Sequence, residues 1–399
     1  MFIGLVGKPS SGKSTTFKAL TLADVAIANY PFTTIEPNEG AAFVRVDCVD
    51  KELNTQCNPR IGYCINHIRF VPVKLLDVAG LVPDAHLGKG KGNQFLDDLR
   101  QADVLIHVID VSGSTNDKGE PVAAGSHDPA FDIRFLEREL DLWYLGILKK
   151  GWEKFARTLQ QEHGQIHKAL AKQLSGLGVN DDMVKSSLGK YGLSEKLPTA
   201  WTEEEMLSLA ADLRQKTKPM LIAANKIDVP GAKENYERLK QEYPQYTIVP
   251  CSAEAEVALK EAAKHGLIEY IPGAQDFKIL KPESLSDAQK KALEFIRRNL
   301  LQAFGSTGIQ QMIDSAVFDV LRYIAIFPGG VKQLTDSEGR RLPDCFLFKP
   351  NSTALDFAFG IHSDLGNNFI RAIDVKTKKA VGKDHVLQHR DVIEIVSSK

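Results

Sequence analysis

The chain has 399 residues, 43% hydrophobic and 25% charged, which is typical of a globular protein with two or three domains. Its 50 lysines and arginines nearly balance 51 aspartates and glutamates, so overall charge does not argue for nucleic-acid binding. The first apolar run follows no signal peptide, and no apolar stretch reaches membrane-spanning length. We therefore expect a cytoplasmic protein without a membrane partner.

The first motif lies between the apolar run Phe2–Val6 and a helical pattern over residues 15–20. A strand, a glycine-rich loop, a Lys-Ser pair and a helix make up a phosphate-binding P-loop, whose N–H groups cradle anions. Lys13 is expected to reach the β- and γ-phosphates and to act in catalysis, and Ser14 to bind Mg²⁺. The residues predicted to hold the nucleotide here are Gly7, Lys8, Pro9, Ser10, Ser11, Gly12, Lys13, Ser14 and Thr15.

Two later segments carry groups expected to sense the γ-phosphate. Residues 29–38 contain two prolines and are predicted to form a loop, in which a threonine contacts Mg²⁺ and γ-phosphate. The sequence does not decide between Thr33 and Thr34; we count both as catalytic and place Thr34 with the metal ligands. Asp77 ends an apolar strand, where a carboxylate contacts Mg²⁺, and the N–H of Gly80 is expected to approach the γ-phosphate.

Leu81 stands where Ras-type enzymes carry the glutamine that orients the attacking water. A leucine neither donates nor accepts a hydrogen bond, so backbone groups, a cation, His86 or a partner must position the water. A lone loop histidine is more often only solvated. We therefore predict slow intrinsic hydrolysis that a partner accelerates.

The alternation of strands and helices stops between residues 115 and 217. Phe131–Leu148 and Trp152–Leu174 have apolar residues at helical spacing and are predicted to form an antiparallel pair of amphipathic helices. Basic residues on these helices could contact RNA, but a solvated helix face is the interpretation we favour. These residues are Lys149, Lys150, Lys154 and Arg157.

The strand Pro219–Ala224 leads into a motif that predicts guanine recognition, Asn225-Lys226-Ile227-Asp228. Asp228 can accept hydrogen bonds from guanine N1–H and its exocyclic amine, whereas adenine would leave that carboxylate unpaired. Asn225 would support the base site, and the aliphatic part of Lys226 would lie over the ring. After one more strand, a backbone N–H of Ser252 or Ala253 could meet guanine O6.

The five cysteines include no Cys-x-x-Cys pair, and their odd number excludes a secreted disulfide framework. Cys48, Cys57, Cys64 and His67 are close in sequence, but their spacing is looser than that of usual zinc knuckles. We favour buried, redox-inactive thiols, and the sequence leaves open whether this group binds a metal.

The C-terminal residues predict a compact α+β module of short strands packed on one helix. The helix is expected at Thr353–Ile361, and a longer helix at Ser286–Leu301 precedes the module. The predicted strands are Cys345–Phe348, Ile370–Val375 and Val392–Val396.

These motifs together resemble the Obg–YchF group of translation-associated P-loop GTPases. The resemblance rests on residues 7–14, 30–34, 77–83 and 225–228, on His86, and on the glycines and residues 92–96 that follow it. The helical insert is similar to that of the YchF branch. Many YchF proteins have an altered base motif and use ATP, whereas Asn225–Asp228 favours GTP here. Some relatives hold an activating K⁺ with an asparagine at the position of Ser10, so the serine argues against K⁺.

Residues 352–366 and 372–374 resemble the TGS domain, a small ubiquitin-like β-grasp of several translation factors. The resemblance implies a ribosome or RNA partner, reached through the helical insert and the TGS-like domain. The alternatives are a nucleotide-gated RNA- or ribosome-binding module with incidental hydrolysis, and an ATPase. The sequence does not reveal the pathway or the oligomeric state.

We therefore predict a Ras-like α/β P-loop GTPase domain with a mostly parallel sheet, an inserted α-helical domain and a C-terminal α+β β-grasp domain. The expected ligands are GTP or GDP and Mg²⁺, and the expected role is that of a slow nucleotide switch. The predicted boundaries are 1–114 and 215–280 for the GTPase domain, 115–214 for the insert, 281–330 for connecting helices and 331–399 for the TGS-like domain.

Overall fold

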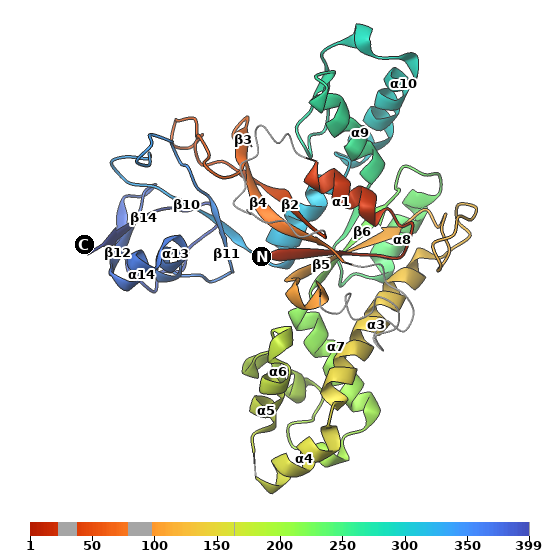
Figure 1. Ribbon diagram of the computed structural model, residues 1–399, viewed down its shortest axis with the longest axis vertical. Coiled ribbons are helices and arrows are strands. Elements are labelled where there is room, and N and C mark those ends of the chain that lie inside the picture. The colour runs from red at the N-terminus through yellow and green to blue at the C-terminus, as the bar shows by residue number, and fades with distance from the viewer. Residues whose placement is uncertain (23–37, 79–97, 163, 399) are drawn as a thin grey trace. The chain divides into compact units, whose positions relative to one another are not determined.

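The computed structural model describes residues 1–22, 38–78, 98–162 and 164–398 (Figure 1). The chain divides into two compact units. The first comprises Met1–Ser14 and Leu76–Cys251, and the second comprises Thr15–Leu75 and Ser252–Lys399. None of the helices in the described ranges combines the length and apolar content that crossing a membrane requires.

The first unit is built on parallel strands in the order β1, β5, β6, β7. All residues of β5 and β6 are buried, as expected for central strands covered on both faces. Asp110, at the end of β5, pairs in register with Asn225 at the end of β6, which pairs with Cys251 at the end of β7. The carboxyl ends of the strands therefore meet at one edge, where α/β proteins bind ligands. The strands are β1 (Phe2–Val6), β5 (Val104–Asp110), β6 (Met220–Asn225) and β7 (Ile248–Cys251), and α8 (Ala232–Glu242) connects the last two.

In the described residues between β5 and β6, five α-helices make up the predicted helical insert. They are α3 (Pro129–Lys149), α4 (Trp152–Gln161), α5 (Ile166–Gln173), α6 (Asp181–Lys190) and α7 (Glu203–Thr217). Each of the two longest has an N-cap: Asp128 accepts a hydrogen bond from Ala130 N at 3.0 Å, and Thr202 forms a capping box with Glu205.

The predicted pairing of the first two helices is wrong. α3 packs against α7, as Figure 1 shows, and residues 152–174 contain two helices, α4 and α5, in place of one. The reason is the apolar face of α7, where Leu209 and Leu213 are fully buried in one core with Leu140 of α3. By contrast, only Ala156 of α4 is fully buried.

The second unit begins with α1 residues from Thr15 and contains β2, β3 and nearly all of β4, followed by the segments after β7. Asp314 of α12 binds β2 through Arg45, accepting hydrogen bonds from its backbone N and from Nε at 2.8 Å each. The elements are α1 (Lys13–Thr21), β2 (Glu39–Asp47), β3 (Tyr63–Ile65), β4 (Ile68–Asp77), α9 (Ala253–Lys264), β8 (Ile268–Glu269), β9 (Lys278–Ile279), α10 (Asp287–Ile296), α11 (Gln302–Phe304) and α12 (Ile309–Ser315). A π-helical turn follows α10 and another follows α12.

The C-terminal module of this unit is a five-stranded sheet in the order β11, β10, β14, β12, β13, with α13 and α14 packed beside it (Figure 1). β10 and β14 are parallel, and the other pairs are antiparallel. Phe357 of α13 is fully buried against Ile326 and Ile393. The elements are β10 (Ile324–Pro328), β11 (Phe346–Phe348), α13 (Ala354–Ile361), α14 (Ser363–Asn367), β12 (Phe369–Asp374), β13 (Lys379–Val381) and β14 (Val392–Ser397).

The predicted fold class is confirmed: an α/β domain with a mostly parallel sheet, a helical region between β5 and β6, and a C-terminal α+β module. The three strands and the helix predicted in the tail are present, and β10 and β13 are additional. β10 belongs to the same sheet although it precedes residue 331, the predicted start of that domain.

Candidate nucleotide-binding site

The loop Gly7–Ser14 connects β1 to α1, as a P-loop requires. A Cβ atom on Gly7 would lie 2.6 Å from Val108 O. Gly12 has a φ of +93°, and a Cβ there would lie 2.1 Å from Asn225 Nδ2. Both positions therefore require glycine. At Gly7 the reason is the close approach of the Val108 backbone, and at Gly12 it is the positive φ together with the nearby Asn225 side chain.

Asn225 connects the predicted base-binding motif to this loop. Its side chain is buried, and Nδ2 donates a hydrogen bond to Ser11 O at 2.9 Å. Residues 214 positions apart in sequence are thus brought together at the carboxyl ends of β1 and β6. This contact places the two predicted halves of the nucleotide site next to each other.

Lys13 and Asp77 form an ion pair between Nζ and Oδ1. The Lys13 side chain is 12% exposed and that of Asp77 is 26% exposed, so both charges are partly shielded from water. Ser14, the next residue, is exposed. The cation predicted to bind phosphate and the carboxylate predicted to bind Mg²⁺ are therefore within one site and hold each other.

Asp110 is a site residue that the sequence analysis missed. It is fully buried and accepts a hydrogen bond from Lys226 Nζ at 2.8 Å, which fixes the lysine in the base motif. Burial favours the neutral carboxyl, but the contacts of Lys226 and three hydroxyl groups outweigh it and lower the pKa of Asp110. The hydroxyl donors are Ser112, Ser114 and Thr115. The sequence feature that could have identified Asp110 is its position as a carboxylate at the end of an apolar strand.

The base motif is shaped by backbone contacts. Lys226 has a φ of +65°, and Ile227 N donates to Cys251 O at 3.2 Å. Asp228 is half-buried, and burial together with the Asp228 charge raises the pKa of the Cys251 thiol. Because Asp228 is only half-buried, a ligand can reach it beyond the end of β6.

The Lys8 side chain supports the loop from the inside. It is buried, and Nζ contacts Thr115 O at 2.8 Å and Asp132 Oδ2 at 2.9 Å. His127 Nε2 lies 2.9 Å from the other oxygen of Asp132. With its ammonium group occupied in this way, Lys8 has its backbone N–H to offer a nucleotide. Pro9 and Ser10 are exposed, and Ser10 has a φ of +61°.

Thr15, Ser252 and Ala253 belong to the second compact unit. Ser252 caps α9, accepting from Ala255 N at 3.4 Å, and its own N–H donates to Thr307 O at 2.9 Å. Ala253 begins that helix. The predicted nucleotide contacts of these three residues stay predictions.

Thr33, Thr34 and Gly80 lie outside the described residues, and so do Leu81 and His86. Their predicted roles in sensing γ-phosphate and positioning water stay predictions.

Three family profiles match the chain. The profile for the 50S ribosome-binding GTPase covers residues 2–130, and the one for the Obg-like GTPase YGR210-like, G4 motif-containing domain covers residues 223–330. The TGS domain profile covers residues 328–397. A GTP-binding protein of Methanocaldococcus jannaschii, itself uncharacterized, is 48% identical over 397 residues, which is 99% of each chain.

The chain belongs to the Obg-like, YchF-type family of P-loop GTPases.

Other members of the YchF-type family agree in length and fold. The ribosome-binding ATPase YchF of Bacillus subtilis is 28% identical and covers 98% of this chain, with 97% of its own length matched. A crystal structure of a GTP-binding protein from Pyrococcus horikoshii is 40% identical over the whole of both chains, with a TM-score of 0.78. The YchF GTPase of Schizosaccharomyces pombe shares the fold, with a TM-score of 0.59. Its sequence is 18% identical, and the match covers 99% of this chain and 97% of that one. The chain is thus a GTP-binding protein of an enzyme family that hydrolyses nucleoside triphosphates.

Proposed function

We propose that this YchF-type protein is a Mg²⁺-dependent guanine-nucleotide switch with slow intrinsic GTP hydrolysis, coupled to the ribosome. The observation that carries the proposal is the convergence of Lys13, Asp77 and Asn225 around one glycine loop in a single compact unit. This convergence supports a single site for phosphate, metal and base.

Lys13 is proposed to leave Asp77 when nucleotide binds, and to stabilise the charge that develops on the transferred phosphoryl group. The N–H groups of the loop, including that of Lys8, bind the phosphates. Ser14 and Asp77 offer the hard oxygen ligands that Mg²⁺ prefers, together with the predicted Thr34. Mg²⁺, when bound, neutralises charge on the β- and γ-phosphates.

Asp228 is proposed to select guanine, because its carboxylate accepts from N1–H and the 2-amino group. Asp110 holds Lys226 so that its aliphatic part can cover the base. Asn225 ties the base motif to the phosphate loop. Ser252 and Ala253 remain our proposed donors to guanine O6.

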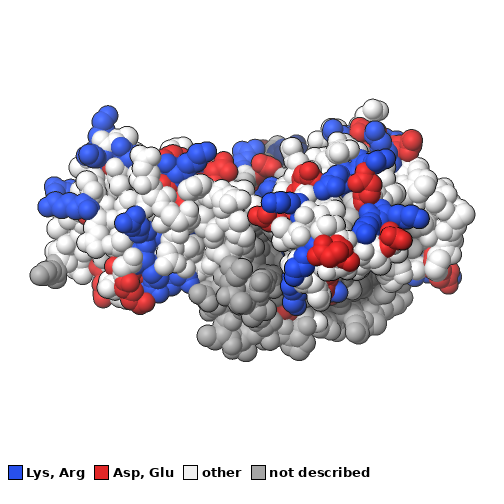
Figure 2. Space-filling model, turned by 90° about the horizontal axis from the view of Figure 1, so that it is seen from above, with Lys and Arg blue, Asp and Glu red and all other residues white. Residues whose placement is uncertain are grey.

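The ribosome or its RNA is the proposed partner, because relatives matched along nearly their whole length are named ribosome-binding. Exposed basic residues on β12, β13 and the turns beside them support this: in the described part of the chain they form no ion pair. They are Arg371, Lys378, Lys379 and Lys383. The face in Figure 2 mixes both charge signs, so such binding would rest on local groups.

The insert offers a second surface, a groove of about 670 Å³ lined by Trp152, Lys154 and Arg157 among others. The Arg157 guanidinium lies 3.7 Å from the Glu153 carboxylate, and the Lys149 ammonium lies 3.0 Å from the Glu203 carboxylate. These acidic neighbours reduce the positive charge of the groove. We therefore rank it below the TGS-like module as an RNA contact. The domain boundaries predicted from sequence and a cytoplasmic location stay part of the proposal.

Two alternatives remain. A module whose nucleotide only gates ribosome binding would bind differently with GTP and GDP, with no stimulation of turnover. An ATPase is the second, since the Bacillus subtilis relative is named one. Asp228 opposes it for the reason given above.

The decisive experiment measures GTP and ATP hydrolysis side by side, with and without ribosomes, in Na⁺ and in K⁺. We expect slow GTP turnover that ribosomes raise and that K⁺ leaves unchanged. A Lys13→Ala variant that binds and hydrolyses GTP normally would contradict the proposal. Equal turnover with and without ribosomes, combined with nucleotide-dependent binding, would favour the gated module.

A further inference from the structure

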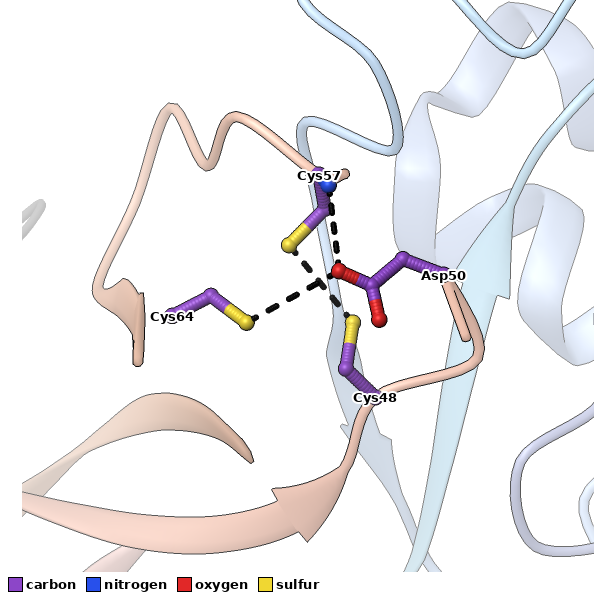
Figure 3. Close-up of side chains that lie close together, drawn as sticks. All are labelled: Cys48, Asp50, Cys57 and Cys64. Carbon is purple, nitrogen blue, oxygen red and sulfur yellow. Dashed lines mark hydrogen bonds between the residues drawn. The ribbon is translucent and has the colours of Figure 1, made fainter. Parts of the chain in front are cut away.

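Four side chains of the second unit converge between the end of β2 and β3 (Figure 3). Cys48 follows β2, Asp50 and Cys57 lie in the loop after it, and Cys64 lies in β3. Their ligand atoms all lie within 4.8 Å of one another. Cys48 Sγ is 3.6 Å from Cys57 Sγ, and Cys64 Sγ is 4.0 Å from Asp50 Oδ2.

We propose that Cys48, Asp50, Cys57 and Cys64 form a structural zinc site. Bonds of about 2.3 Å from zinc to sulfur separate two tetrahedral ligand sulfurs by about 3.8 Å. The observed separation of 3.6 Å between Cys48 and Cys57 is close to this. Soft thiolate ligands select zinc over Mg²⁺ and Ca²⁺, which prefer oxygen ligands. Three thiolates and one carboxylate complete the four ligands of a closed, structural site.

Asp50 is a buried carboxylate held in position for this role. It is 0% exposed, and Oδ2 accepts from Cys57 N at 3.1 Å. The other oxygen, Oδ1, lies 2.9 Å from His67 Nδ1. Ligating groups in metal sites are commonly fixed by a second hydrogen-bonding partner of this kind. His67 thus acts here as a positioning residue, and the carboxylate provides the fourth ligand.

The thiols lie within hydrogen-bonding distance of one another and of the carboxylate: Cys48 Sγ contacts Cys57 Sγ, and Cys64 Sγ contacts Asp50 Oδ2. Arg69 of β4 pairs in register with Cys64 of β3, beside this cluster. A bound metal replaces the protons shared between such thiols.

Arg69 provides an independent reason for negative charge here. Its side chain is 0% exposed, and its two terminal nitrogens donate to Leu342 O at 3.0 Å and Pro343 O at 2.8 Å. Within the described ranges no carboxylate forms an ion pair with this guanidinium. A buried charge without compensation is costly. Three thiolates and a carboxylate around a divalent ion leave a net negative charge, which the guanidinium offsets.

The site would fix the loop that contacts residues 341–344, which lie between β10 and β11 of the C-terminal module. Asn58 N donates to Arg341 O at 2.8 Å, and Arg60 N donates to Pro343 O at 2.9 Å. The Arg60 guanidinium also pairs with Asp344 at 3.0 Å. Between β2 and β3 the loop has no long helix or strand of its own to hold these groups. Zinc therefore orders the surface on which residues 341–344 rest.

A disulfide is the competing state of these cysteines. All five cysteines are free, and 3.6 Å between two sulfurs far exceeds a disulfide bond of about 2.05 Å. A bond between Cys48 and Cys57 would also leave the Cys64 thiol against the Asp50 carboxylate with no role.

The test uses the full chain, produced in zinc-supplemented medium and purified without chelators. We expect about one equivalent of zinc by elemental analysis. After exchange into Co²⁺, thiolate-to-cobalt charge-transfer absorption and tetrahedral d–d bands should appear. Cys57→Ser and Cys64→Ser should each lower the metal content at least tenfold. Cys345→Ser, a matched change to a cysteine outside the four, should retain the zinc and the cobalt spectrum.

Several outcomes would overturn the proposal. The first is wild-type protein that holds less than a tenth of an equivalent of zinc and shows no cobalt charge-transfer band. The second is wild-type protein that holds a full equivalent of iron. The third is a thiol titration of the unfolded chain, under non-reducing conditions, that finds only three thiols. Loss of the metal in Cys345→Ser would overturn the assignment of Asp50 as the fourth ligand. The wild-type measurements decide the matter even where a cysteine variant does not fold.

Discussion

The ammonium group of Lys13 contacts the carboxylate of Asp77, so each of two proposed nucleotide ligands occupies the other. Nucleotide must therefore break this pair, sending the cation to phosphate and leaving the carboxylate for the metal. Without Mg²⁺, the same carboxylate repels the phosphates and competes for Lys13.

Asp77→Asn should separate these two effects. With Mg²⁺ we expect GTP affinity to fall about 10- to 100-fold, from the loss of a charged contact of about 1.5–3 kcal/mol. In EDTA the variant should bind GTP at least as tightly as the wild type, because the repulsion is gone. Isothermal titration under both conditions measures this. Equal weakening in both would contradict the role of Asp77 at the metal. Asp103→Asn, which changes a carboxylate at the amino end of β5, serves as the control.

Gly12→Ala should weaken nucleotide binding at least tenfold. Its Cβ would meet Asn225 Nδ2, so the contact between loop and base motif must move. Gly178→Ala is the matched control, because its φ of +79° imposes a similar backbone cost of about 1–2 kcal/mol with no atom within 4 Å of the new Cβ. Both variants should lose stability in urea unfolding, but only Gly12→Ala should lose affinity. Equal affinities would show that the contact does not matter for binding.

Asp228→Asn should change the preferred base. An asparagine accepts from N1–H but presents an amide donor where guanine has an amine, whereas xanthine has a carbonyl there. We expect GTP affinity to fall about 10- to 100-fold and affinity for xanthosine triphosphate to rise. Glu234→Gln, an exposed change at the start of α8, should leave the preference unchanged. An unaltered preference in Asp228→Asn would remove this residue from the base site.

His107 should make the fold sensitive to acid. It is 1% exposed, and burial first, then the charge of Lys8, lowers its pKa from 6.5 to about 3. Between these values the unfolded chain binds more protons than the folded one, so stability falls as the pH drops below 6.5. The expected contribution at pH 5 relative to pH 7 is about 2 kcal/mol. Urea unfolding of wild type and His107→Leu at both pH values measures it. If the free energy of unfolding of His107→Leu fell between pH 7 and pH 5 by as much as that of the wild type, this role of His107 would be contradicted.

The strands and the motifs at their ends could be predicted from sequence because their signals are local. An apolar run followed by Asp77 or Asn225 can be recognised without knowing which strands lie beside it. The helical insert can be recognised in the same way, from the helical spacing of its apolar residues. The pairing of α3 with α7 could not be predicted, because both candidate partners have amphipathic patterns and only packing decides between them.

Contacts between distant residues were also invisible. Lys226 is 116 positions from Asp110, and no pattern joins them before the sheet places β5 beside β6. The cysteine cluster is similar: its spacing fits no standard motif, and its members meet because the loop returns to β3. Lys8 is predicted among the residues that hold the nucleotide, but the sequence does not reveal that Asp132 engages its side chain in the buried interior and leaves its backbone N–H for that role.

Asn225–Asp228 is proposed to make this a guanine-nucleotide protein. Competition of unlabelled GTP and ATP against bound labelled GDP, in the presence of Mg²⁺, tests it most directly. We expect GTP to displace the label at a concentration at least 100-fold below that of ATP. Displacement by ATP at an equal or lower concentration would contradict the account.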